Sequence, residues 1–196
     1  MNKVEVDITS FLSVYEPVNL KYWKLYRDSK IDQGELRYGR LKETFNALKF
    51  QVEDQLIHVL SEDYITYLTT FDHLFEDAID ILNYLQPKYQ LHIITNGFGE
   101  TQQKKLEVSK ITHYFKTVTN AEIAGVKKPN PIIFNHALQL ANAKVEQSIM
   151  IGDSYEADVL GAMDVGLQAI FFNYKGSQCE PHITQIKQLK QIKMYL

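Results

Sequence analysis

A short apolar run that ends in two acids, at residues 149–158, limits most strongly how this chain can fold. The run stops at Gly152, and Asp153 and Asp158 follow as a helical spacing of apolar residues begins. A buried strand of this kind brings its carboxylates to its own C-terminal end, where the ligand crevice of an open α/β sheet lies. Carboxylates there can hold a hard cation against a bound anion. The alternative is that Asp153 or Ser154 only caps the following helix.

The second half of the chain alternates between strand and helix patterns. Helices are expected over 76–85, 100–108, 132–141 and directly after 151, and strands over 89–94, 116–119, 148–151 and 169–172. This alternation predicts right-handed crossovers and a mainly parallel, doubly wound, Rossmann-like α/β sheet. Residues 183–196 have the spacing of a closing amphipathic segment.

The first half is predicted to be helical. Apolar residues recur at helical spacing from about Ser10, interrupted only by Pro17, and again over 52–69. Between them Asp32 and Glu35 have the spacing of a capping box. Three such helices make a small bundle with aromatic residues as its core. Since the pattern changes near His73, we expect a helical domain at residues 1–73 and an α/β domain at residues 74–196.

Charge and composition exclude several classes of partner. The 196 residues carry 21 Lys and Arg against 24 Asp and Glu, a net charge of -3, without a basic tract. Binding to nucleic acid or to an anionic membrane through bulk charge is therefore not expected, and the partner should be a small molecule. The single cysteine, Cys179, fits a reducing cytosol. No apolar run reaches the length of a membrane span and no signal-peptide pattern is present, so a cytoplasmic protein is expected.

Polar signatures follow three of the predicted strands. Thr95 and Asn96 follow the first, Lys128 lies in the loop after the second, and Asp153 and Asp158 follow the third. The carboxyl ends of parallel strands meet at one edge of a sheet. A hydroxyl with backbone N–H groups, a lysine and carboxylates holding Mg²⁺ together suit a phosphoryl group. Taken singly, each has a plainer reading as a turn residue, a surface charge or a helix cap.

These motifs resemble those of a known family. The segments 95–97, 128–131 with Phe134, and 152–154 ending in Asp158 look like the second, third and fourth motifs of the haloacid dehalogenase (HAD) superfamily of phosphohydrolases. The helical half resembles the C1-type cap of that superfamily. The residues that make the chain most similar to the pyrimidine 5'-nucleotidase branch are Asn19, Trp23, Tyr26, Asn96, Gly97, Phe98, Gln102, Gln103 and Leu106.

The resemblance implies a role for each motif. Thr95 would bind the phosphoryl oxygens, with Asn96 and Gly97 donating to the same phosphate. Lys128 would neutralise charge on the nucleophile and the phosphate. The metal site would be formed by Asp153, which ligates Mg²⁺, and Asp158, which orients a metal-bound water or the lysine. The implied activity is Mg²⁺-dependent hydrolysis of a small phosphate monoester, in particular a nucleoside 5'-monophosphate such as a pyrimidine nucleotide, through an aspartyl-phosphate. The cap would select the substrate by closing over the site.

The first motif of the family is missing. Its nucleophile lies in a DxDx[TV] sequence at the end of the first strand, and no such sequence occurs in the 196 residues. The nearest string, at residues 5–9, has Glu in the nucleophile position, and Asp7 there can instead cap the first helix. In the family this strand lies between the strands that here end at Thr95 and at Asp153. Without it, both neighbours should present unpaired backbone groups inside the sheet.

Three explanations are open for the missing strand. The chain can be a shortened form of a longer protein, begun at an internal methionine. Residues Lys3 to Ile8, whose apolar positions alternate, can fill the gap as a strand in cis or from another subunit, which would involve self-association. Finally, the chain can be a catalytically inactive HAD-fold protein that binds phosphate or nucleotide, or acts as an interaction partner, without turnover.

Overall fold

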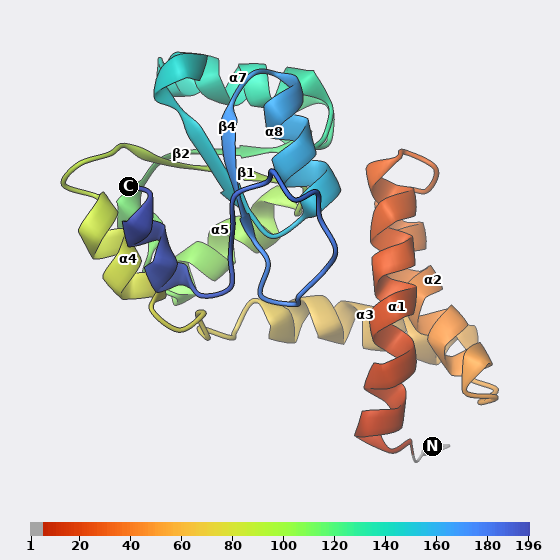
Figure 1. Ribbon diagram of the computed structural model, residues 1–196. Helices are drawn as coiled ribbons and strands as arrows, with labels where there is room; N and C mark the ends of the chain where they lie inside the picture. The colour runs from red at the N-terminus through yellow and green to blue at the C-terminus, as the bar shows by residue number, and fades with distance from the viewer. Residues whose placement is uncertain (1–5) are drawn as a thin grey trace. The chain divides into compact units, whose positions relative to one another are not determined.

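The computed structural model describes residues 6–196, which divide into two units (Figure 1). The first unit ends at Leu68 and the second begins at Thr69, whereas the sequence pattern placed the boundary near His73. Within the described residues, no helix combines the length and the apolar character needed to cross a membrane.

The first unit consists of helices α1 (Ile8–Arg27), α2 (Gln33–Ala47) and α3 (Asp54–Leu68). The Asp7 carboxylate caps α1 by accepting a hydrogen bond from Ser10 N at 2.8 Å. The predicted capping box at the start of α2 is confirmed. The expected interruption at Pro17 is wrong, since α1 continues through it. A proline inside a helix removes one ladder hydrogen bond and crowds the carbonyl four residues earlier, and here the helix continues on both sides of that point.

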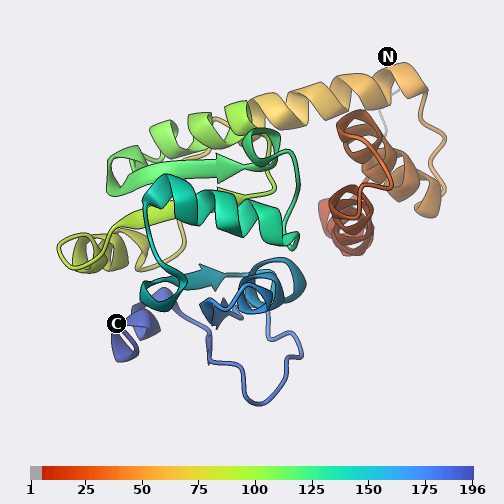
Figure 2. The same cartoon turned by 90° about the horizontal axis from the view of Figure 1, so that it is seen from above.

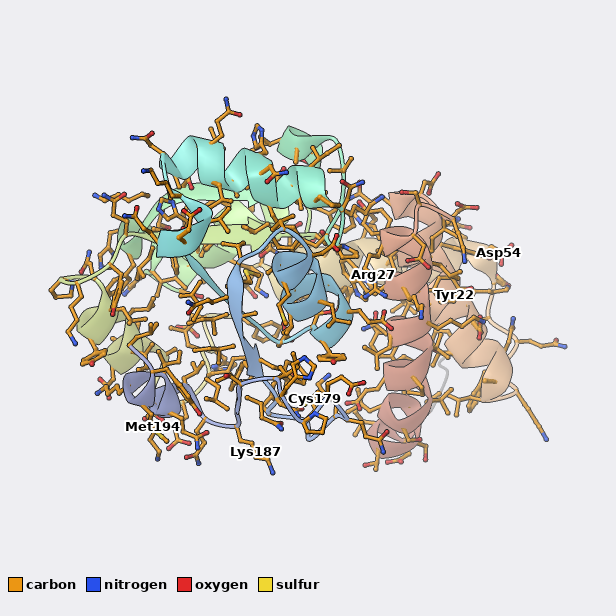
Figure 3. All side chains as sticks on the ribbon, turned by 45° about the horizontal axis from the view of Figure 1, so that its top comes forward. Tyr22, Arg27, Asp54, Cys179, Lys187 and Met194 are labelled. Carbon is orange, nitrogen blue, oxygen red and sulfur yellow. The ribbon has the colours of Figure 1, made fainter. Side chains whose placement is uncertain are left out.

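The core of the helical unit lies between these three helices. Its buried members are Tyr15, Leu41, Phe45, Val52 and Ile57. The prediction that aromatic residues form part of this core is confirmed for Phe45. In addition, the Phe11 ring stacks on the Tyr15 ring, with 5.5 Å between the ring centroids. The absence of a side chain at Gly39 on α2 leaves room for the Tyr22 ring of α1, which Figure 3 labels.

The second unit contains five parallel strands in two separate sheets. Strand β1 (Leu91–Thr95) pairs with β2 (Phe115–Asn120), with Ile94 opposite Thr119. The second sheet has the order β3 (Ile149–Gly152), β4 (Gln168–Phe172), β5 (Gln185–Ile186). The predicted parallel α/β architecture is confirmed, and the two sheets are distinct ribbons in Figure 2.

Helices cover both sheets. The elements are α4 (Ala78–Leu85), α5 (Gly99–Val108), η1 (Thr112–Tyr114), α6 (Ala121–Ala124), α7 (Pro131–Ala141), η2 (Val145–Gln147), the π-helix η3 (Tyr155–Leu160), α8 (Gly161–Asp164) and η4 (Leu189–Met194). Sequence patterns missed α6 and β5, which are too short to show a periodicity. The segment expected to close the fold as one amphipathic stretch is divided between β5 and η4.

Strands β1 and β3 lie in one layer but are not paired with each other. Leu91 and Ile149 both pack against a cluster that includes α4 and η4, while Ile94 and Met150 both pack against a cluster that includes α7 and α8. Every residue of both strands is only half-buried, although apolar strands of a doubly wound sheet are normally buried on both faces. Within the described residues neither strand has a second hydrogen-bonded neighbour. We call the position between these two unpaired edges, which the missing strand of the family would occupy, the open lane.

The end of the segment Lys3 to Ile8 that the structure describes does not form a strand in this lane. Ile8 is the first residue of α1 and Asp7 is its N-cap, because the Asp7 carboxylate stabilises a helix start at that point. The expectation of a strand continuing to Ile8 is therefore wrong. Residues 1–5, including Glu5 of the ExDxT string, lie outside the described part of the chain.

Candidate active site

The loops after β1, after α6 and after β3 meet at the carboxyl edge of the α/β unit. Direct contacts join three of the predicted site residues, Asn96, Lys128 and Asp158. Thr95 is the last residue of β1, and Asp153 immediately follows β3. Thr95 and Asp153 thus flank the carboxyl end of the open lane, which is where the sequence analysis places a ligand.

Lys128 is buried at this edge, with 7% of its surface exposed. Its ammonium lies 2.6 Å from Asp158 Oδ1 and donates a hydrogen bond to the Ile94 carbonyl oxygen at 2.7 Å. Burying an ammonium is costly unless it is paired and hydrogen-bonded, and Lys128 is both. The alternative reading of Lys128 as a solvated surface charge is therefore wrong.

Asn96 holds the backbone of Lys128 in place. Its Nδ2 donates to the Lys128 carbonyl oxygen at 2.9 Å, and its Oδ1 accepts from Lys128 N at 2.7 Å. The Lys128–Pro129 peptide bond that follows is cis. Because both the oxygen and the nitrogen of the Asn96 amide contact Lys128, its backbone N–H and the second amide hydrogen are left for the phosphate contact expected from this residue. This positioning role was not found by sequence reasoning.

The Thr95 hydroxyl organises the turn after β1. Its oxygen accepts a hydrogen bond from Gly97 N at 2.9 Å, which occupies the N–H that the family resemblance assigned to phosphate. The hydroxyl hydrogen of Thr95 is still available, since a hydroxyl can donate one hydrogen bond while accepting others. In this arrangement Thr95 is the residue of the turn best placed to donate to a phosphoryl oxygen.

Both carboxylate oxygens of Asp158 are used within the protein. Oδ1 faces Lys128, and Oδ2 accepts from Ser154 N at 3.0 Å. Asp158 is 4% exposed and lies in the π-helix η3, whose N-cap is Ser154. A Cβ atom at Gly152 would overlap the Asp158 side chain, so glycine is required there. Of the two expected roles, orienting a metal-bound water or the lysine, the geometry has Asp158 holding the lysine.

The Asp153 carboxylate differs from that of Asp158, because no side chain or backbone group of the described residues bonds to it beyond its own N–H. Asp153 is exposed to solvent. The pKa of its carboxyl is nevertheless raised above the usual value of 3.8, first because neighbouring protein atoms exclude water from the charged form and second because Asp158 is negatively charged. A cation at this point would relieve both effects.

Magnesium fits Asp153 as one carboxylate ligand. Mg²⁺ is usually held by one or two carboxylates together with water and substrate phosphate. The described residues contain no cluster of three or more His, Cys, Asp or Glu side chains with metal-binding geometry. Asp153 lies next to the carboxyl end of the open lane, so a carboxylate arriving there would be near it.

Comparison with known proteins identifies relatives over most of the chain. Residues 3–172 match the family model described as haloacid dehalogenase-like hydrolase. The chain is 31% identical to the pyrimidine 5'-nucleotidase YjjG of Escherichia coli over 160 residues, which are 81% of this chain and 69% of that protein. It is 30% identical to a glyceraldehyde 3-phosphate phosphatase of Methanothermobacter thermautotrophicus over 188 residues, covering 87% and 80% of the two chains.

Solved structures have the same fold. The HAD-hydrolase YfnB of Bacillus subtilis superposes with a TM-score of 0.87 at 24% identity, covering 98% of this chain and 84% of that one. The YfnB crystals are described as bound to magnesium and as revealing interdomain movement. A dehalogenase superposes with a TM-score of 0.77 at 20% identity, covering 98% of this chain and 86% of that one. At these identities the likeness concerns the fold alone.

Proposed function

Because the chain belongs to the haloacid dehalogenase-like hydrolases, we propose that it carries the phosphate- and magnesium-binding parts of a phosphohydrolase acting on small phosphate monoesters. A nucleoside 5'-monophosphate is the substrate we favour. Two of the relatives, from Escherichia coli and Streptococcus pneumoniae, are pyrimidine 5'-nucleotidases, and others are phosphatases of small phosphorylated compounds.

The observation that carries this proposal is the buried ammonium of Lys128. It is fixed between the Asp158 carboxylate and the Ile94 carbonyl oxygen, at the carboxyl edge where ligands of parallel sheets bind. A positive charge that is already fixed in position costs no reorganisation when negative charge develops on a transferring phosphoryl group. Asn96 and Asp158 then act as positioning residues for Lys128.

The other site residues have complementary roles in this proposal. The Thr95 hydroxyl donates to a non-bridging phosphoryl oxygen, and the backbone N–H of Asn96 donates to the same group. Asp153 holds the metal. When bound, Mg²⁺ withdraws charge from the phosphoryl oxygens and fixes the orientation of the phosphate.

The nucleophile in this account is a carboxylate at the end of a strand that fills the open lane. The carboxylate oxygen attacks phosphorus, and the P–O bond to the nucleoside breaks as its oxygen takes up a proton from the second Asp of the Asp-x-Asp sequence that such a strand would carry. Water then attacks the acyl phosphate, which gives inorganic phosphate and restores the carboxylate. The lane ends beside Lys128, so such a carboxylate would arrive next to a fixed positive charge.

The test is to supply the strand. An apolar segment ending in Asp-x-Asp is added before residue 1, and release of inorganic phosphate from uridine 5'-monophosphate is measured with and without Mg²⁺. We expect Mg²⁺-dependent release from the extended protein and none from the unextended chain. The matched control has Asn in place of the first Asp of the extension, and should be inactive but equally stable.

A second variant separates the metal site from the nucleophile. Asp153→Asn in the extended protein should lower release by at least about 100-fold, because a metal ligand is lost at the reacting group. The proposal is contradicted if the extension protects the amides of β1 and β3 from hydrogen exchange, showing that it occupies the lane, and still no phosphate is released.

A further inference from the structure

Arg40, on α2 of the helical unit, is a buried cation without a counter-ion among the described residues. Only 3% of its surface is exposed, and no carboxylate of residues 6–196 forms an ion pair with it. An arginine side chain does not lose its proton in a protein, so the charge cannot be removed by titration. A buried charge of this kind is destabilising unless another group compensates it.

The contacts of Arg40 leave one edge of its guanidinium group unused. Nη1 donates to Asn19 Oδ1 at 3.0 Å, and the group lies over the Tyr64 ring at 4.6 Å from the centroid. Nε is fully buried and has no hydrogen-bond partner. An arginine commonly clamps a two-oxygen anion with two parallel N–H donors, and the edge that contains Nε can serve in this way.

A second buried donor without a partner lies beside it. The Tyr15 hydroxyl has no partner at standard hydrogen-bond geometry within the described residues, and the nearest phenol is that of Tyr64, whose ring is 6.5 Å from the Tyr15 ring. Burial raises the pKa of Tyr15, the charge of Arg40 offsets part of that effect, and the neighbouring Tyr64 phenol raises the pKa further. The phenol therefore stays protonated and can donate. Unpaired buried donors are rare in proteins, and here two of them flank one aromatic ring.

We propose that Arg40 and Tyr15, with Asn19 holding the guanidinium in place, bind the carboxylate group of a small organic acid. A planar group with two oxygens matches the free edge of the guanidinium, with the Tyr15 hydroxyl as a further donor. One negative charge neutralises the one positive charge. A phosphate dianion would leave an excess negative charge beside the apolar cluster of Tyr15, which includes Phe11 and Phe45. None of these residues belongs to the candidate active site.

The experiment follows the Arg40 Nε–H signal by NMR while the full chain is titrated with sodium propionate at constant ionic strength. We expect a saturable shift of that signal. Arg40→Lys should weaken propionate binding by about tenfold or more, because a lysine lacks the paired donors. The matched control is Arg37→Lys on the same helix, whose guanidinium faces Glu62 at 4.0 Å, and it should bind propionate as the unsubstituted chain does.

Tyr15→Phe keeps the proposal testable if Arg40→Lys unfolds the protein. It removes only a hydroxyl without a partner, so the protein without ligand should be as stable or more stable, while propionate binding weakens by about threefold or more. The proposal is overturned if no saturable shift appears, if Tyr15→Phe leaves binding unchanged, or if inorganic phosphate saturates the Arg40 signal at lower concentration than propionate.

Discussion

The Lys128 ammonium and the Asp158 carboxylate lie 2.6 Å apart, and both side chains are more than nine-tenths buried. Neither residue is placed by its own element alone. Asn96 fixes the backbone of Lys128, and Ser154 N fixes the second oxygen of Asp158. The pair therefore ties together the loops that follow β1, α6 and β3.

Removing one member of this pair should be strongly destabilising. Lys128→Met leaves the Asp158 charge buried with only the Ser154 N–H, and we expect a loss of about 3 kcal/mol or more in the free energy of unfolding. Asp158→Leu should cost a similar amount. The double variant should lose clearly less than the sum, because neither charge is then left unpaired. Urea unfolding of the four proteins checks this, and simple additivity would contradict a direct pairing.

Asn96→Asp tests the positioning of Lys128. The carboxylate can still accept from Lys128 N, but it cannot donate to the Lys128 carbonyl oxygen, so one of two bonds is lost. We expect a loss of about 1 to 2 kcal/mol. Asn46→Asp, at a position on α2 with no such contact, is the control and should lose little. Equal unfolding midpoints for the two variants would show that the amide clamp has no effect.

Gly152→Ala tests the close approach of β3 and η3. The new Cβ would overlap the Asp158 side chain, which is held on both sides and cannot move freely. We expect a loss of about 2 kcal/mol from overpacking. Gly34→Ala on α2 is the matched control, since its Cβ would meet only the exposed Asp32 carboxylate. That change should be neutral or stabilising because alanine favours helix.

Asp153→Asn should raise the melting temperature at neutral pH without metal. The folded protein raises the pKa of this carboxyl, so its ionised form opposes folding once the pH exceeds that pKa. The contribution of Asp153 to the free energy of unfolding is therefore fully present below pH 3.8, the usual pKa of the carboxyl. It is lost as the pH rises through the higher pKa that the carboxyl has in the folded protein. The gain of the Asn variant should therefore be larger at pH 7.5 than at pH 4.5.

With Mg²⁺ added, the unsubstituted chain should have a higher melting temperature than Asp153→Asn, the reverse of the order without metal. Binding to the folded state raises the melting temperature of the unsubstituted chain and has no such effect on Asp153→Asn. The exposed helical residue Asp63 provides a control, because Asp63→Asn should change neither property. A variant that gains no stability at pH 7.5, or that keeps the full response to Mg²⁺, would contradict the metal role of Asp153.

Sequence reasoning located the strands and long helices because their apolar periodicities are local. The strand ending at Thr95 and the helix over 131–141 follow from such patterns. It also selected Lys128, Asp153 and Asp158 as candidate site residues from their places after strands. Contacts between segments distant in the chain were not accessible in the same way. The clamp between Asn96 and Lys128 joins residues 32 positions apart, and no local pattern encodes it.

The open lane was predicted from a missing motif. An apolar strand such as β3 gives no sign in sequence of being half-exposed. That property appears only when its neighbours are known. Short elements such as β5, which has two residues, were not predicted because their pairing partner and not their own pattern defines them.

Amide hydrogen exchange of β1 and β3, measured by NMR, tests the lane most directly. In the chain without extension, amides of Leu91–Thr95 that do not donate to β2, and amides of Ile149–Gly152 that do not donate to β4, should exchange rapidly. An added strand ending in Asp-x-Asp should slow them to the rates of β4. Slow exchange of the same amides before any strand is added would contradict the account.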